Sequence, residues 1–75
     1  MNAPLLDGLR RDLQGIASDL KWSAVELKRI AERLSVAGND PDAQAIYRMV
    51  TLFQADEARL NTRSAEITAA VELSE

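Results

Sequence analysis

The residues of this chain that could do chemistry are carboxylates. Four of them suggest the acidic set with which a helical bundle can hold a pair of iron ions: Glu26, Glu32, Asp56 and Glu57. That arrangement also requires histidines in Glu-x-x-His motifs, and the chain contains neither histidine nor cysteine. The same composition removes thiolate chemistry, nearly every structural zinc site and the commonest general base near neutral pH. We therefore expect no catalytic residue, no metal ion and no cofactor.

The charge pattern disfavours nucleic acid as a ligand. The 75 residues include nine Lys and Arg and twelve Asp and Glu, and the net charge is −3. The two signs alternate along the whole length, so no basic block could follow a phosphate backbone. A small RNA- or DNA-binding bundle is therefore only a third hypothesis.

The N-terminal segment lacks the basic region of a signal peptide, and no apolar stretch approaches the roughly 20 residues that span a bilayer. We expect no membrane partner and a cytoplasmic location, with export without a cleavable signal as the alternative. The Ala-, Leu- and Arg-rich composition is typical of a bacterial protein.

One strong break, Gly-Asn-Asp-Pro-Asp, divides the chain into two segments. Gly38 suits the C′ position of one helix, Asp40 the N-cap of the next helix and Pro41 its first position. A single continuous helix would hold Gly38 and Pro41 in its interior, at a cost of about 1 and about 3 kcal/mol. The predicted bounds are a first helix over about 4–37, a turn over 38–40 and a second helix over about 41–73.

Apolar residues recur every three or four positions in both segments, as in helices that pack against each other. With Leu6 as heptad position a, the first segment has leucine at every a position and Ser23 as its only polar d residue. Folding back at the turn brings a layers opposite d layers, which predicts an all-α antiparallel two-helix coiled coil in one domain. Ser23 then faces Glu57, and we interpret this pair as a polar layer that sets the register.

The e positions beside this seam are small and uncharged. Alanine at every seventh residue widens the apolar stripe to the width typical of bundle helices, and a chain this short needs additional packing. We predict that two copies meet through this face in a four-helix bundle of two-fold symmetry. The alternative is that alanine is simply the best helix former. The predicted self-association face comprises Ala17, Ala24, Ala31, Tyr47, Gln54 and Asn61.

Apolar residues outside the seam predict contact with another protein. Trp22 is the only tryptophan, and Lys21 and Lys28 lie near it, so it suits an aromatic anchor rimmed by cations. The alternative is a tryptophan that lies flat on neighbouring side chains or inside a larger oligomer. The predicted partner-binding residues are Trp22, Val25, Arg29, Val36, Met49 and Leu52.

These patterns predict a non-enzymatic protein–protein interaction module. The module would be a small homodimeric adaptor, chaperone or anti-activator that binds a partner protein through helix faces. The alternative is a self-assembling structural subunit, filament- or needle-like, whose two unequal sides bind each other head to tail.

Overall fold

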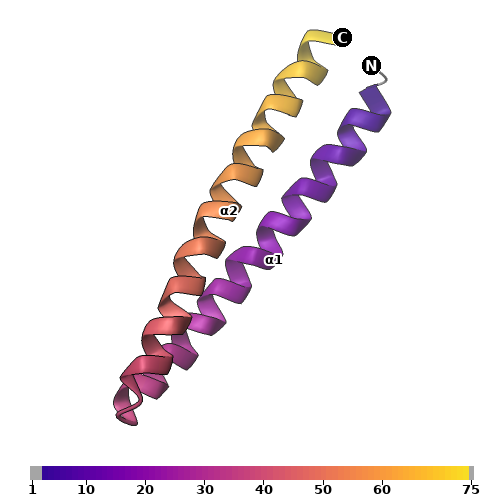
Figure 1. The fold of residues 1–75 in the computed structure, drawn as a ribbon. Helices are drawn as coiled ribbons and strands as arrows, with labels where there is room; N and C mark the ends of the chain where they lie inside the picture. Colours follow the sequence, from indigo (N-terminus) through magenta and orange to yellow (C-terminus); the bar gives the residue numbers. More distant parts are fainter. Residues whose placement is uncertain (1–2, 75) are drawn as a thin grey trace.

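Two long helices make up the fold. The computed structural model describes residues 3–74, in which α1 (Ala3–Val36) and α2 (Asp40–Ser74) pack against each other as an antiparallel hairpin. Figure 1 shows the single turn at one end, with the first turn of α1 and the last turn of α2 at the other. We call that second end the open end. The predicted all-α hairpin is confirmed, and each helix begins and ends within one residue of its predicted bounds.

The turn is closed by backbone hydrogen bonds that only a glycine accommodates without strain. Asn39 N donates to Leu34 O at 2.8 Å and Gly38 N donates to Ser35 O at 3.0 Å, the paired bonds of a Schellman C-cap. Gly38 has φ of 85°, the left-handed conformation that a Cβ disfavours. The predicted C′ role of Gly38 is therefore confirmed.

The N-cap of α2 lies one residue earlier than predicted. Asp42 N donates to Asn39 Oδ1 at 3.4 Å, and Asn39 Nδ2 donates to Asp42 Oδ2 at 2.7 Å. Asn39 thus caps the backbone amide of Asp42, and the Asp42 carboxylate accepts a hydrogen bond from the Asn39 side chain. Asp40 is the first helical residue, and its carboxylate suits the positive end of the helix dipole. The assignment of Asp40 as N-cap was therefore wrong.

The buried face of α1 differs from the predicted a/d seam. Its e-position alanines are the most deeply buried residues, with Ala17 3%, Ala24 4% and Ala31 0% exposed. The d residues Leu9 and Ile16 are 48% and 49% exposed. Small side chains let two helix backbones approach closely, and α1 is rotated so that this alanine line faces α2. The larger d residues are thereby displaced to one side of the seam.

α2 contributes its a positions to the same contact. Ala43, Val50 and Ser64 are 1%, 6% and 3% exposed, so small side chains meet small side chains along the seam. Ser64 Oγ finds no hydrogen-bond partner among the residues that the structure describes. A buried hydroxyl without a partner is destabilising, so the seam accepts Ser64 for its size and at some cost in stability.

At the start of α1 a carboxylate is held between two arginines. Arg10 Nε donates to Asp7 Oδ1 at 3.1 Å, and Arg11 Nη2 lies 3.1 Å from Asp7 Oδ2. The pKa of Asp7 is lowered, chiefly by the hydrogen bond from Arg10 and further by the charges of Arg10 and Arg11, against desolvation that raises it. These contacts tie successive turns of α1 together near the open end.

The hairpin is a rod with little interior. It measures 57 × 13 × 12 Å and has a radius of gyration of 16.9 Å, against about 11 Å for a compact domain of this length. No large side chain among residues 3–74 is fully buried. Neither helix of this part of the chain contains a stretch long and apolar enough to cross a membrane.

Candidate protein-binding surfaces

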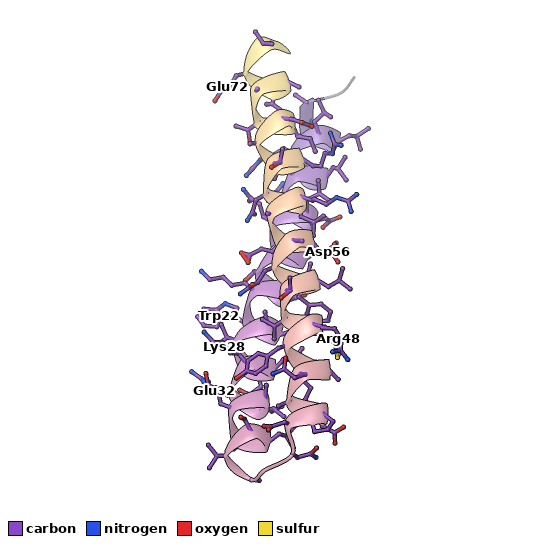
Figure 2. The ribbon with its side chains drawn as sticks, turned by 60° about the vertical axis from the view of Figure 1, so that its left-hand side comes forward. Trp22, Lys28, Glu32, Arg48, Asp56 and Glu72 are labelled. Atoms are coloured by element: carbon purple, nitrogen blue, oxygen red, sulfur yellow. The ribbon has the colours of Figure 1, made fainter. Side chains whose placement is uncertain are left out.

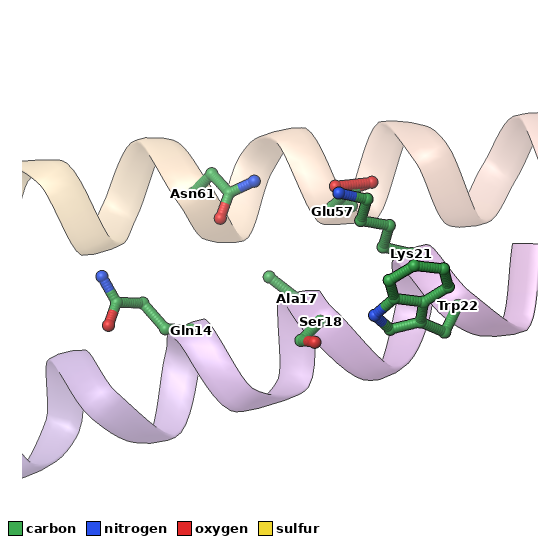
Figure 3. A pocket seen from close by; sticks show the side chains of 7 residues that line it. All are labelled: Gln14, Ala17, Ser18, Lys21, Trp22, Glu57 and Asn61. Atoms are coloured by element: carbon green, nitrogen blue, oxygen red, sulfur yellow. The ribbon is translucent and has the colours of Figure 1, made fainter.

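The two sides of the seam carry different chemistry. On one side, a groove between the helices is lined by α1 and by the e and a positions of α2 (Figure 3). It continues toward the turn along Ala24, Val25 and Lys28. We call this side the tryptophan flank, and its principal side chains are Gln14, Lys21, Trp22, Val25, Lys28, Gln54, Glu57 and Asn61.

Trp22 is the most prominent side chain of the tryptophan flank. It is 62% exposed, and Lys21 Nζ lies 5.5 Å from the centre of its ring. A cation at this distance is attracted to the ring face by about 0.5–1 kcal/mol at an exposed site. Figure 3 shows the indole beside Lys21 and Ser18 at the edge of the groove. The exposed indole is therefore a candidate aromatic anchor.

The cations around Trp22 give its surroundings a local positive bias. Lys21 and Lys28 line the groove, while Glu57 is the carboxylate that faces it from α2. Arg29 is engaged on its own helix, with Nη1 3.6 Å from Glu26 Oε2. The chemistry that complements this flank is an apolar side chain flanked by carboxylates.

On the other side of the seam, Leu20 of α1 meets Asp56, Leu60 and Arg63 of α2 around a second groove. Ile16 and Ser23 adjoin Leu20 on this side, because Ala17 and Ala24 adjoin it on the tryptophan flank. Figure 2 agrees, since Trp22 and Asp56 project from opposite sides of the hairpin. We call this side the methionine flank, and it comprises two lines of residues at seven-residue spacing, Leu9, Ile16, Ser23 and Ile30 of α1 and Met49, Asp56, Arg63 and Ala70 of α2.

The predicted self-association face is not the exposed surface that we expected. Ala17, Ala24 and Ala31 are covered by α2, so they close the hairpin itself and cannot be shared with a second copy. Gln54 and Asn61 are exposed and Tyr47 is half-buried beside them. Sequence periodicity found the alanine line correctly, but assigned it to the wrong partner because it could not show how α1 rotates.

The predicted partner-binding residues do not form one surface. Trp22 and Val25 line the tryptophan flank, whereas Met49 and Leu52 are exposed at 45% and 59% on α2. Met49 belongs to the methionine flank, and Leu52 lies about one helical turn after Met49 on α2. Arg29 and Val36 lie together on the outer side of α1 near the turn. The six candidates therefore separate into at least two surfaces.

The predicted polar layer is also not a buried pair. Ser23 is exposed on the methionine flank, whereas Glu57 is half-buried and lines the tryptophan flank. The rotation of α1 that buries the alanines also carries Ser23 out of the seam. Ser64 is instead the polar residue that the seam buries.

Leu9 and Ile16 are the residues that sequence analysis assigned to the core and that lie at the surface. The signal that could have found them is the small size of Ser64 and Ala17 at the level of Ile16, since two small residues favour close helix approach.

Among residues 3–74, no group of three or more acidic side chains could hold a metal ion. Searches against protein-family models, curated proteins and solved structures found no match to this chain.

Proposed function

We propose that this chain is a non-enzymatic protein–protein interaction module. In this proposal it forms a homodimeric four-helix bundle and binds a second protein through a helix face, as an adaptor, chaperone or anti-activator. The observation that carries the proposal is the exposed indole of Trp22, which lies next to Lys21 and beside a groove between two helices. Exposed aromatic anchors of this kind are enriched at protein interfaces.

The groove favours a helix as the bound segment. A partner helix aligned with the seam would place an apolar side chain against Trp22 and Val25, in the groove-binding mode of amphipathic helices. Its carboxylates would then lie near Lys21 and Lys28, which are exposed and available for such contacts. The proposed partner is therefore an amphipathic helix with acidic residues next to its apolar anchor.

The dimeric state is supported by how little the hairpin buries. A short chain without a large buried side chain generally needs further packing to be stable. A two-fold dimer of hairpins supplies that packing as a four-helix bundle.

Affinity capture with a matched control tests the Trp22 proposal. Wild type, Trp22→Ala and the control Leu73→Ala would each be immobilised and exposed to extract of the native host, since Leu73 is likewise an exposed apolar residue at 89%. The protein retained most strongly by wild type would then be purified and titrated by calorimetry. We expect Leu73→Ala to bind like wild type and Trp22→Ala to bind at least about tenfold more weakly. Equal binding of Trp22→Ala, with helicity unchanged, would contradict the proposal.

A self-assembling structural subunit is the second candidate. Val36 near the turn and Leu73 near the open end are 91% and 89% exposed, so apolar side chains stand at both ends of the rod. Contacts between unlike ends do not close and would produce a filament. Electron micrographs and the mass distribution at high concentration distinguish the two candidates, because a filament former gives a series of masses and the proposed module gives one.

A further inference from the structure

The methionine flank has no role in the partner binding proposed for Trp22. The chain exposes 5356 Å², whereas a compact monomer of 8.3 kDa exposes about 4,600 Å². The excess of about 800 Å² equals the area that each partner buries in a protein interface of standard size. The excess surface of the rod is therefore large enough for one interface of standard size.

Apolar side chains gather at both ends of the methionine flank and charged ones lie between them. Leu9 and Ile16 of α1 are about half exposed toward the open end, and Met49 of α2 is 45% exposed toward the turn. Asp56 and Arg63, of opposite charge, lie between Leu9 and Met49 and line the central groove together with Arg59. Any occupant of this flank must therefore match two apolar ends and a central pair of opposite charges.

A second copy of the chain matches this pattern when it is reversed. Reversing the α2 line about its midpoint brings Asp56 opposite Arg63, and brings Met49 opposite Ala70. Reversing the α1 line brings Leu9 opposite Ile30 and Ile16 opposite Ser23. The Asp56–Arg63 pair thus forms twice in the dimer, and the apolar ends meet apolar or small residues.

One two-fold axis can perform both reversals. The midpoint of the α2 line lies next to Leu60 and that of the α1 line lies next to Leu20, and these two leucines line the same groove. An axis across the hairpin at this level would place the two turns at opposite ends. A two-fold axis along the rod would instead set Ile16 against Arg63 and Ser23 against Asp56, which leaves both charges without a counterion.

We infer that the methionine flank is the docking surface for a second copy of this chain, with the two hairpins antiparallel and their turns at opposite ends. Asp56 of each copy then meets Arg63 of the other, and Leu9, Ile16, Ile30 and Met49 supply the buried apolar contacts. This inference rests on the dimer of the proposed function and names its interface. The tryptophan flank stays accessible in such a dimer, on the outer side of each hairpin.

Charge reversal tests the reciprocal pairing by sedimentation equilibrium. Asp56→Arg and Arg63→Asp each set like charges against each other twice, and we expect each to raise the dimer dissociation constant about tenfold. The double variant restores opposite charges and should return to within about twofold of wild type. Arg63 also contacts Glu66 on its own helix at 3.0 Å, but that contact lies within one chain and cannot produce a rescue between copies. Glu32→Arg, a reversal of an exposed carboxylate outside the flank, is the matched control and should leave the dissociation constant unchanged.

The possible outcomes distinguish failure of the proposed dimer from failure of the proposed interface. A wild type that stays monomeric at every concentration would overturn both the proposed dimer and this interface. The dimer could instead be stable with a dissociation constant that neither single reversal changes, or the double variant could dimerise no more tightly than the single variants. Either result would leave the dimer in place and overturn the methionine flank as its interface. Weakening by each reversal together with rescue by the double variant supports the interface.

Discussion

Two apolar lines of α1 differ in how deeply the structure buries them. The alanine line, Ala17, Ala24 and Ala31, is almost completely buried, while Leu9 and Ile16 of the neighbouring d line are about half exposed. Burial of the larger side chains would remove more apolar surface from water. The small line is buried instead, because small side chains such as alanine let two helix backbones approach closely. The larger line is thereby left for contacts outside the hairpin.

The residues that close the hairpin are therefore different from those that are exposed for contacts with other molecules. Closure depends on small residues of both helices, and the tryptophan flank and the methionine flank lie on the two sides of the seam. Substitutions in the alanine line are therefore expected to change the stability of the hairpin, and substitutions in the d line are expected to change its association.

The largest expected effect is on association. Ile16→Glu puts a charge into the apolar part of the proposed interface twice per dimer, and we expect the dimer dissociation constant to rise about a hundredfold or more. Because Ile16 is 49% exposed, the variant should keep the helicity of wild type when both are monomeric. Sedimentation equilibrium and circular dichroism on the same samples measure both quantities. Dimerisation that survives Ile16→Glu would remove the d line from the interface.

The next effect is on the hairpin itself. Ala31→Leu inserts a larger side chain where Ala31 is 0% exposed, and overpacking there should destabilise the fold by about 2 kcal/mol. Ala55→Leu is the matched control on the exposed surface of α2 and should stay within about 0.5 kcal/mol of wild type. Urea denaturation, at a concentration where association is the same for all three proteins, gives the free energies of unfolding. A neutral Ala31→Leu would mean that the alanine line does not close the hairpin.

A smaller effect of opposite sign is expected at Ser64. Ser64→Ala removes a buried hydroxyl that has no hydrogen-bond partner within residues 3–74 and leaves the shape of the seam almost unchanged. We expect the variant to be more stable than wild type by about 1 kcal/mol. A loss of stability in the same denaturation experiment would show that the hydroxyl is hydrogen-bonded in solution.

The smallest effect concerns pH. The pKa of Asp7 is lower in the folded chain than its ordinary value of 3.8, chiefly because of the hydrogen bond from Arg10. Asp7 therefore stabilises the fold above that pH, and the contribution is lost as pH falls below it. Wild type should lose stability as the pH falls below 3.8, and part of that loss comes from Asp7. Asp7→Asn lacks this part, so its denaturation midpoint should fall less in acid than that of wild type. Identical acid profiles for the two proteins would count against the Asp7 contact.

Sequence reasoning predicted most of the fold and less of the surfaces. The glycine and the proline around the turn located the break, because each has a strong positional preference at a helix end. Heptad periodicity identified which residues are apolar and near the seam. It could not determine the rotation of α1, since the a/d and a/e stripes overlap and their order depends on how closely the backbones approach. That single rotation explains why the roles of Ala24, Ile16 and Ser23 were mispredicted together.

The most direct test of the antiparallel dimer is a distance between its two turns. The chain has no cysteine, so Val36→Cys provides one labelling site at a residue that is 91% exposed and outside the methionine flank. With turns at opposite ends, the two spin labels should be about 50 Å apart, given the rise of a helix between residue 36 and the two-fold axis. Double electron–electron resonance measures this distance in the intact dimer. A distance near 50 Å supports the antiparallel arrangement of the two hairpins, whereas a distance under about 30 Å, or no dipolar coupling at dimer-forming concentrations, would contradict it.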